Sequence, residues 1–512
     1  MGHKLSTLAL ISSTFALTAC TVGPDFVRPD SALPKRWFAT SAAAANSAGS
    51  GTAVLEPVDP AWWQAFHDAT LTSLVRRLAD ANLDVQTATV RLAESRFQRG
   101  AVASAQLPSL NGSARYQHQN LSDVSAKGTL IDSLLGSPNS TISSAKPDNL
   151  FTSGFDVSWE LDLWGHVRRQ VEAADAQVQS SEEQRRDALL SSLAETARDY
   201  IQLRGTQTLI RITNDNLKIE RDILQLTQTR QQKGLTTSLD VENAAAQVEA
   251  VRAQLPSLEQ QEAQQINALS FLLGLPPDAL RGELATGKQV VPRPARIPIG
   301  IPSELARRRP DIRAAEAQLH AATADIGVAV AEFYPSLQLN GSVGFDALKV
   351  ASQLTAHAIP TSVGPSISIP IFEGGRLKAT LQLRKAQQVE AAIAYHRTVL
   401  EAWHEVVNAL VAYRTERQRS ARLAMQVQHL RQALSLARDR YNDGVTEFTT
   451  VLDTARILLQ AEQDHAQSTT NISINLVQLY KALGGGWELT YPSAPPEPSV
   501  SAQGRSRATE PT

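Results

Sequence analysis

The stretch FTSGFDVSWELDL, Phe151–Leu163, decides the fold of this chain of 512 residues. Every second residue in its later part is apolar, namely Phe155, Val157, Trp159, Leu161 and Leu163. The residues between them are polar or acidic, namely Asp156, Ser158, Glu160 and Asp162. Because successive side chains of a β-strand point to opposite faces, this alternation predicts a strand with one apolar and one charged face. Membrane barrels with a water-filled lumen are built from such strands.

Three further segments are predicted to be strands. LQLNGSVGFD, from Leu337 to Asp346, alternates in the same way, Ile367–Ile371 has isoleucine at every second position, and a segment starting near Leu110 alternates weakly. Four strands are too few for a transmembrane barrel, because the smallest single-chain barrels have about eight. An open sheet edge in lipid would also leave backbone groups without hydrogen bonds. We therefore expect the barrel to be shared between several copies of the chain.

A long helix is predicted after each pair of strands. Residues 166–232 and 376–442 contain no proline, and at 1.5 Å per residue each run would extend about 100 Å. Apolar residues recur at coiled-coil spacing in the second run and in the helix that returns from the first, which predicts packing of helix on helix. These residues are Leu423, Val427, Leu430, Leu434, Ala437 and Tyr441, and Ala244, Val248, Val251, Leu255 and Leu258.

Each long run is predicted to end in a tight turn that starts a return helix. Gly234 and Gly444 stand where a left-handed cap is needed, and hydroxyl residues within 236–238 and 446–449 can cap the next helix. Pro256 predicts a bend or break in the first return helix, whereas its counterpart Ala466 predicts none. Each half of the chain therefore ends in a helical hairpin.

The sequence matches itself, which predicts an internal two-fold repeat. Residues 82–110 align with residues 309–337 without a gap, so that Pro-Ser-Leu at Pro108 falls on Pro-Ser-Leu at Pro335. Further along, Gly234 falls on Gly444 without a gap. The chain thus consists of two similar halves.

The N-terminus has the pattern of an export signal. MGHKLSTLALISSTFALTAC has a short basic start, an apolar stretch and small residues before Cys20, the only cysteine. A single cysteine excludes an internal disulfide, and no Cys or His neighbour at metal-ligand spacing suggests a metal site there. Leu17-Thr18-Ala19-Cys20 resembles the bacterial lipobox, which implies a covalent lipid on Cys20. Thr21, in place of the aspartate associated with inner-membrane retention, points to the outer membrane.

These features divide the chain into six segments. They are a lipoprotein signal peptide at 1–19, a lipidated N-terminal segment at 20–70, the first repeat at 71–284, a linker at 285–302, the second repeat at 303–486 and a disordered tail at 487–512, which is rich in Pro, Ser and Ala. Beyond the signal, no stretch reaches about 18 consecutive apolar residues, so we expect no transmembrane helix.

Composition and motifs argue against two other classes of protein. A formal net charge of -2, without a long basic run, gives no electrostatic reason to expect a nucleic-acid partner. The acidic pair Glu160 and Asp162 has no accompanying pocket motif, and neither a nucleophile elbow, a phosphate-binding glycine loop nor clustered metal ligands are present. We expect no catalytic residues and no cofactor other than the lipid.

Four motifs in order resemble the TolC-like outer-membrane efflux lipoproteins of the NodT type. They are TVGPDFVRP after the lipobox, RRRPDIRAAEAQL, AEFYPSLQLNGSVGF and PIFEGGR. The resemblance covers nearly the whole mature chain and implies an α+β membrane protein that forms a homotrimer. Four strands per chain would build a twelve-stranded barrel in the Gram-negative outer membrane, continued by an α-helical coiled-coil tunnel through the periplasm. The protein would be the passive exit channel of a tripartite efflux pump for small molecules such as drugs.

The resemblance also implies partners and functional residues. An inner-membrane transporter of the resistance-nodulation-division type would cooperate with a periplasmic adaptor, or membrane fusion protein. The adaptor would contact the hairpin tips at Gly234, Leu235, Thr236, Gly444, Val445 and Thr446. The gate would contain Asp453, Thr449, Asp240 and Tyr441, with Asp453 forming an inward acidic ring that favours cations.

One departure leaves the closing contact of the gate open. Thr446 stands where relatives have a basic residue, so Arg440 or Arg456 would replace it, or the gate would depend on packing. Two other functions use related architecture. A type I protein-secretion duct would have the same fold, and a periplasmic adaptor would have one hairpin with lipoyl and barrel domains; the two hairpins alternating with strands favour the efflux channel.

Overall fold

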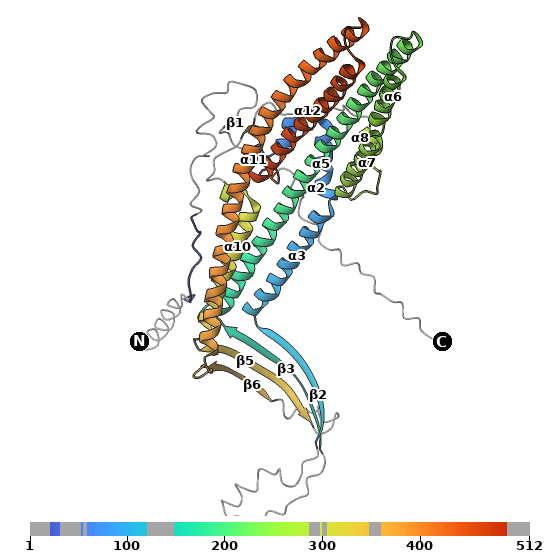
Figure 1. The fold of residues 1–512 in the computed structure, drawn as a ribbon. Helices are drawn as coiled ribbons and strands as arrows, with labels where there is room; N and C mark the ends of the chain where they lie inside the picture. Colours follow the sequence, from blue (N-terminus) through green and yellow to red (C-terminus); the bar gives the residue numbers. More distant parts are fainter. Residues whose placement is uncertain are drawn as a thin grey trace, which may run out of the picture. The chain divides into compact units, whose positions relative to one another are not determined.

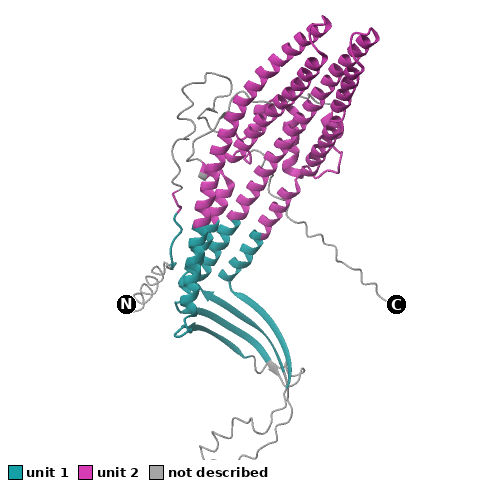
Figure 2. Ribbon diagram, in the orientation of Figure 1, with its two compact units in different colours: residues 1–27, 95–178, 318–392 teal, residues 28–94, 179–317, 393–512 magenta. Residues whose placement is uncertain are grey.

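The computed structural model describes residues 21–30, 53–54, 59–119, 148–285, 297–298, 305–347 and 360–488. The predicted signal peptide, Cys20, most of the predicted linker and nearly all of the predicted tail lie outside these residues. The chain forms two compact units (Figure 2). Unit 1 comprises residues 1–27, 95–178 and 318–392, and unit 2 comprises residues 28–94, 179–317 and 393–512. Both units take segments from both halves of the sequence, so they do not test the predicted repeat boundaries.

Unit 1 contains one antiparallel sheet of four strands in the order β2-β3-β5-β6 (Figure 1). The strands are β2 (Ser109–Gln119), β3 (Asp148–Leu161), β5 (Ser336–Ala347) and β6 (Thr361–Ser368). All four predicted strands are confirmed, including β2, whose alternation was weak. The sheet ends sooner than the alternation does, because Ile369 and Ile371 lie beyond β6. β6 ends at Ser368, so Pro370 lies outside the ladder, where its missing amide hydrogen costs no hydrogen bond.

The apolar face of this sheet is exposed within unit 1. Phe155 pairs with Val343, and Trp159 pairs with Leu339, so these side chains share one face. Phe155 is 58% exposed and Val343 40% exposed. A soluble sheet buries such a face, so its exposure here is the first structural sign that this sheet meets an apolar environment.

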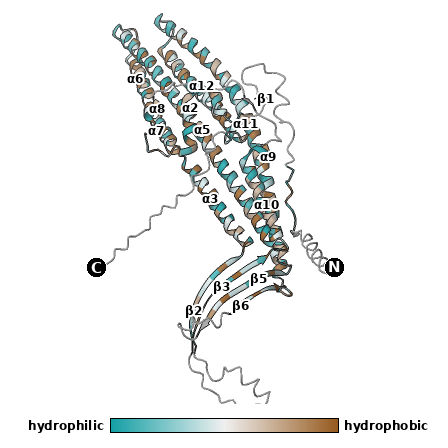
Figure 3. Cartoon of the chain, turned by 180° about the vertical axis from the view of Figure 1, so that it is seen from behind, coloured by the Kyte–Doolittle hydropathy of each residue, from teal (hydrophilic) through white to brown (hydrophobic). Residues whose placement is uncertain are grey.

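The remaining elements are mostly helices, and their bounds match the predicted long runs. They are η1 (Trp62–Phe66), α2 (Ala69–Ala81), α3 (Leu83–Ala103), η2 (Ser104–Gln106), α5 (His166–Gln232), α6 (Ser238–Arg252), α7 (Leu255–Leu272), α8 (Arg281–Ala285), α9 (Leu305–Arg308), α10 (Pro310–Ala331), α11 (Arg376–Asn442) and α12 (Phe448–Ala482), with a short parallel pair of β1 (Ala53–Val54) and β4 (Ile297–Pro298). Hydrophilic and hydrophobic residues are interspersed along both long helices, α5 and α11 (Figure 3). Among the described helices, none is long and apolar enough to cross a membrane.

The two return helices differ as Pro256 predicted. The first return is broken into α6 and α7, with Pro256 in the first turn of α7, where its missing amide hydrogen is tolerated. The second return, α12, is one helix of 35 residues that runs through Ala466. The break is therefore a local effect of proline on one of two similar hairpins.

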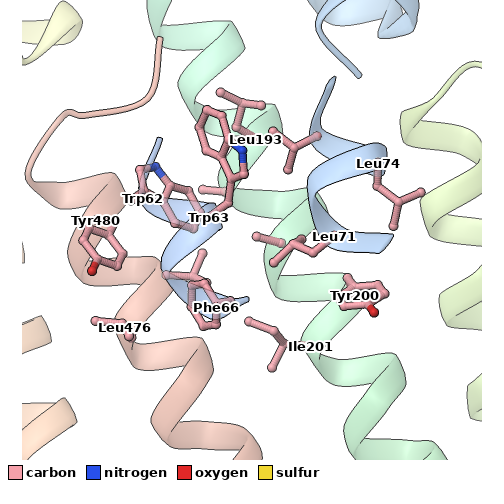
Figure 4. Close-up of a cluster of buried hydrophobic side chains, with 14 of the residues drawn as sticks. Trp62, Trp63, Phe66, Leu71, Leu74, Leu193, Tyr200, Ile201, Leu476 and Tyr480 are labelled. Carbon is pink, nitrogen blue, oxygen red and sulfur yellow. The ribbon is translucent and has the colours of Figure 1, made fainter. Parts of the chain in front are cut away.

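The main core of unit 2 joins the start of the first half to the end of the second (Figure 4). Trp62 is fully buried and stacks on Tyr480 with ring centroids 5.2 Å apart. The indole Nε1 of Trp62 donates a hydrogen bond to the Gly485 carbonyl, 3.0 Å away. Phe66 of η1 is also buried, and it packs in the same cluster as Leu476 of α12. The segment around η1 therefore belongs to the core of unit 2.

The residues that directly follow Cys20 pack against other segments of unit 1. The amide of Val22 donates to the Trp164 carbonyl at 3.1 Å, and Arg169 donates to the Val22 carbonyl at 3.2 Å. Arg169, whose side chain is only 4% exposed, also pairs with Asp25 at 2.7 Å. Burial lowers the pKa of Arg169, but the carboxylates of Asp25 and Glu172 outweigh it, so its pKa is raised. Residues 21–27 are thus held in a defined position within unit 1.

We expect Gly23→Ala to release this segment. Gly23 has φ +92°, and an added Cβ would lie 2.5 Å from the Cα of Gly327, so both the backbone and the space exclude a side chain. Hydrogen exchange of residues 21–27 should become faster by roughly tenfold or more. Gly100→Ala on α3, where a Cβ would meet nothing within 4 Å, is the matched control. Unchanged hydrogen exchange in Gly23→Ala would show that a side chain fits between position 23 and Gly327.

Candidate functional site

The predicted site residues gather at the ends of two helical hairpins of unit 2, α5–α6 and α11–α12. One buried apolar cluster joins the four helices, so the hairpins pack side by side. Its buried members are Ile223, Ala244, Val427, Leu434, Ala437, Tyr441, Phe448, Val451, Ala455, Leu458 and Ala461. Val427, Leu434, Ala437 and Tyr441 were predicted from coiled-coil spacing, and their burial confirms the packing face.

The two hairpin turns have the same backbone geometry. In the first, Gly234 has φ +70°, Leu235 N donates to Arg230 O, and Gly234 N donates to Gln231 O. In the second, Gly444 has φ +75°, and the corresponding bonds run to Arg440 O and Tyr441 O. This is the Schellman pattern, in which glycine adopts the left-handed conformation after the helix ends. The predicted glycine caps are confirmed.

Each turn exposes an apolar side chain. Leu235 is 61% exposed and Val445 is 62% exposed, and a Cβ added at Gly234 or Gly444 would meet nothing within 4 Å. Thr236 and Thr446 follow directly. The six predicted adaptor contacts therefore lie at the hairpin ends, where a partner can reach them, while the contact itself remains a prediction.

The structure brings three of the predicted residues together. Asp240 Oδ2 accepts from Thr236 Oγ1 at 2.6 Å and from the amide and hydroxyl of Thr237 at 3.1 and 2.8 Å. Burial raises the pKa of Asp240, but these hydrogen bonds outweigh it and leave its pKa below the ordinary value. Tyr441 Oη donates to Thr236 Oγ1 at 3.4 Å, from the other hairpin. Asp240 therefore caps its own helix and contacts Tyr441 only through Thr236.

The other predicted gate residues lie apart from this group. Asp453 is exposed, and its nearest cation is Arg456, one turn further along α12 at 3.9 Å. The hydroxyl of Thr449 donates to Glu447 at 3.4 Å. Thr446 Oγ1 lies 3.4 Å from the hydroxyl of Thr450, within the same turn. The side chain of Asp453 is 68% exposed, so its carboxylate can face water or an ion.

Arg230 was missed by the sequence interpretation. Its Nη1 donates to the Asn442 carbonyl at 3.0 Å, and its guanidinium lies 4.5 Å from the centre of the Tyr441 ring. A signal was available, because Arg230 falls on Arg440 when the two halves are aligned on Gly234 and Gly444. Both arginines end a long helix, but only Arg230 faces an aromatic residue across the hairpins.

Glu220 is a buried carboxylate among the four hairpin helices. The residue is 1% exposed, and its Oε2 has no hydrogen-bond partner. Burial raises the pKa of Glu220, and the hydrogen bond with Gln247 and the charges of Arg438 and Arg456 lower it only in part. Burial therefore makes the ionised form of Glu220 unfavourable in the folded state.

We expect Glu220→Gln to stabilise the protein at high pH more than at low pH. A carboxyl with a raised folded-state pKa loses stability as pH rises from its ordinary value through the raised value. The neutral amide avoids this loss, so the melting temperature should rise at pH 8, by an amount equivalent to roughly 1 kcal/mol, and the gain should shrink towards pH 4. Glu242→Gln, at an exposed position on α6, is the control. An equal gain at both pH values would contradict the account.

A second polar region lies at the end of the sheet in unit 1. A pocket of about 460 Å³ is lined by Glu160, Asp162, His166, Glu332, Glu373 and Arg376, among others. Its acids already have partners, since Asp162 pairs with Arg168 at 3.2 Å and Glu160 lies 3.3 Å from His166 Nδ1. In the described ranges, no group of three or more His, Cys, Asp or Glu side chains could hold a metal ion. The pocket is a charged, water-accessible surface.

A sheet with an exposed apolar face and two long helical hairpins are features expected of an outer-membrane channel. A family model described as "Outer membrane efflux protein" matches residues 74–275 and 301–485. The chain belongs to the outer membrane efflux protein family, a non-enzymatic class of channels. It is an outer-membrane efflux duct, and the resemblance inferred from its motifs is confirmed.

Individual relatives are similar in sequence to this chain over nearly its full length. Nodulation protein T of Rhizobium leguminosarum is 30% identical over 488 residues, covering 95% of each chain. Outer membrane protein OprJ of Pseudomonas aeruginosa is 32% identical over 483 residues, covering 92% of this chain and 94% of OprJ. The probable efflux pump outer membrane protein TtgC of Pseudomonas putida is 31% identical, covering 94% of this chain and 96% of TtgC. The solved outer-membrane channel OprN superposes with a TM-score of 0.82 at 34% identity, covering 91% of this chain and 100% of OprN.

Proposed function

We propose that three copies of this chain assemble into one exit duct, and that each copy supplies four strands to a twelve-stranded barrel in the outer membrane. The observation that carries this proposal is the sheet itself. In the described ranges, β2 and β6 each pair along one side only, and the apolar face is exposed. Pairing β2 of one copy with β6 of the next would satisfy both edges and turn the apolar face to lipid.

The helices would form the periplasmic tunnel below the barrel. α5 and α11 have 67 residues each, which corresponds to about 100 Å of helix. Their identical glycine turns support the internal two-fold repeat, in which each copy contributes two equivalent hairpins. The lipid on Cys20 would anchor each copy to the Gram-negative outer membrane, directly before the segment held by Arg169.

The hairpin ends would contact a periplasmic adaptor that links the duct to an inner-membrane transporter of the resistance-nodulation-division type. Exposed Leu235 and Val445 are suited to pack against an apolar partner helix. We infer that the cargo consists of small molecules such as drugs. The relative TtgC, named as part of an efflux pump, supports this cargo over a secreted protein, which a type I secretion duct would carry.

The acidic ring proposed at Asp453 is tested by ion selectivity. Three exposed carboxylates at one constriction would attract cations and repel anions. We expect Asp453→Ala to lower the cation-to-anion permeability ratio of single channels by about two- to threefold, because one charge per copy is removed. Reversal potentials across a salt gradient in planar bilayers measure this ratio.

Asp80→Ala is the matched control, since Asp80 is an exposed carboxylate on α2, far from the hairpin ends in sequence. Its channels should keep the wild-type ratio. If Asp453→Ala and Asp80→Ala channels had the same selectivity as the wild type, the acidic ring would be refuted, while conduction itself would still support the duct.

A further inference from the structure

We propose that Arg230 is the cation that holds the two hairpins of one copy together when the duct is closed. This inference rests on the proposed function, because it assigns a role to Arg230 in opening and closing. Arg230 lies in the last turn of α5, and both groups that it contacts belong to the last turn of α11. It therefore bridges the hairpins at the ends of their long helices.

The first contact is with the C-terminus of α11. The Schellman turn there uses the carbonyls of Arg440 and Tyr441, and Arg230 Nη1 donates to the next carbonyl, that of Asn442, at 3.0 Å. The last carbonyls of a helix carry the negative end of its dipole and need donors from elsewhere. A guanidinium is well suited to this position, because it supplies both a positive charge and a donor.

The second contact is with the Tyr441 ring. Tyr441 is 5% exposed and packs on Phe448, with ring centroids 5.7 Å apart, so its ring has a fixed orientation. The Arg230 guanidinium lies 4.5 Å from the ring centre, within the range of a cation–π interaction. The phenol oxygen of the same tyrosine reaches Thr236. Tyr441 is thus held by the first hairpin at both its face and its hydroxyl.

The position of Arg230 also fits a contact that has to break and re-form. Its Nε is buried without a hydrogen-bond partner. Separation of the hairpins would expose this donor to water, which offsets part of the loss of the two contacts. The arrangement therefore favours a contact that stabilises the closed state without preventing opening.

Arg230 accounts for the departure at Thr446. Thr446 carries no charge, and Arg456 lies 3.9 Å from Asp453 within its own helix, where both side chains are more than half exposed. Arg440 is exposed, and its backbone carbonyl serves its own turn. Two arginines make described contacts between the hairpins: Arg438 Nη2 donates to the Ile219 carbonyl at 3.3 Å further along the helices, and Arg230 makes its contact at the hairpin ends. Arg230 therefore supplies, from the first hairpin, the positive charge that Thr446 of the second hairpin lacks.

The test is single-channel recording of the full mature, lipidated protein in planar bilayers. Loss of one cation–π contact and one charged hydrogen bond should raise the ratio of open to closed time by about tenfold in Arg230→Ala. Arg230→Lys keeps the charge but not the planar group, so it should lie between the wild type and Arg230→Ala. Tyr441→Leu should change the ratio less in the Arg230→Ala background than in the wild type, because the cation–π contact is already absent there.

Arg221→Ala is the control, since it removes an exposed arginine from the same helix. It should gate like the wild type, and all variants should keep the wild-type oligomeric mass and helix content. Wild-type gating in Arg230→Ala would overturn the inference while leaving the proposed duct intact. If the wild type itself did not conduct, the proposed function would fail instead. Should Arg230→Ala not fold, Arg230→Gln provides the same comparison, because it keeps a donor for Asn442 and loses the charge.

Discussion

Arg309→Ala should lower the melting temperature of the protein by roughly 5 °C, because it removes the buried cation of an ionic network in unit 2. The side chain of Arg309 is 10% exposed and pairs with Asp311 at 2.6 Å and Glu405 at 2.7 Å. Its Nη1 also donates to the Ala482 carbonyl at 2.9 Å. The residue therefore joins the start of α10, the middle of α11 and the end of α12.

The charges around Arg309 explain the expected loss of stability in Arg309→Ala. Burial lowers the pKa of Arg309, but Asp311 and Glu405 outweigh it and raise its pKa well above the ordinary value. The partly buried Asp187 has a pKa raised by burial and by Asp311, and Arg309 is one of the cations that lower it. The side chains of Asp311 and Glu405 are 30% and 57% exposed, so water screens the charges that remain, and the loss should be about 2 kcal/mol, less than for a fully buried pair.

Arg307→Ala is the matched control for this prediction. Arg307 lies in α9, two residues before Arg309, and is exposed. Thermal melting followed by circular dichroism should leave Arg307→Ala within a degree or two of the wild type. If the two variants melted together, the network around Arg309 would not stabilise unit 2.

The double variant Leu235→Asp with Val445→Asp should abolish efflux in cells while leaving the isolated channel unchanged. Both side chains are apolar and exposed at the hairpin ends. Placing a carboxylate without a partner into an apolar contact costs about 2–5 kcal/mol, which corresponds to a loss of adaptor affinity of roughly thirtyfold or more. Drug susceptibility of a strain that depends on this duct measures efflux, and bilayer conductance measures the channel.

Phe271→Asp serves as the control, because Phe271 is 71% exposed on α7, outside the hairpin turns. It should support wild-type drug resistance. A double variant that exported drugs normally would show that the partner does not contact Leu235 and Val445. A double variant that lost conductance would show that these residues act in the channel itself.

The local elements of this fold could be predicted from sequence. Alternation identified the four strands, the absence of proline identified α5 and α11, and Gly234, Gly444 and Pro256 identified the turns and the break in the first return helix. These features are encoded by neighbouring residues, so one sequence is sufficient. The last strand was predicted at Ile367–Ile371 but lies at Thr361–Ser368, because Ile369 and Ile371 continue the alternation beyond the end of the ladder.

The packing of distant segments could not be predicted. Nothing in the residues around Trp62 announces a partner more than 400 residues away, although the ring stacks on Tyr480 and donates to Gly485. The site shows the same limit. Asp240 and Tyr441 were expected in one network, yet only the packed hairpins show Thr236 between them and Arg230 over the ring.

The measurement that tests the central claim most directly is the mass of the purified mature protein in detergent, combined with its conductance in planar bilayers. The edge strands β2 and β6 each pair on one side only, and the apolar face of the sheet is exposed. We therefore expect a trimer with small, cation-selective channels. A stable monomer without channel activity would contradict the shared barrel, since one copy would then have to satisfy its sheet edges alone.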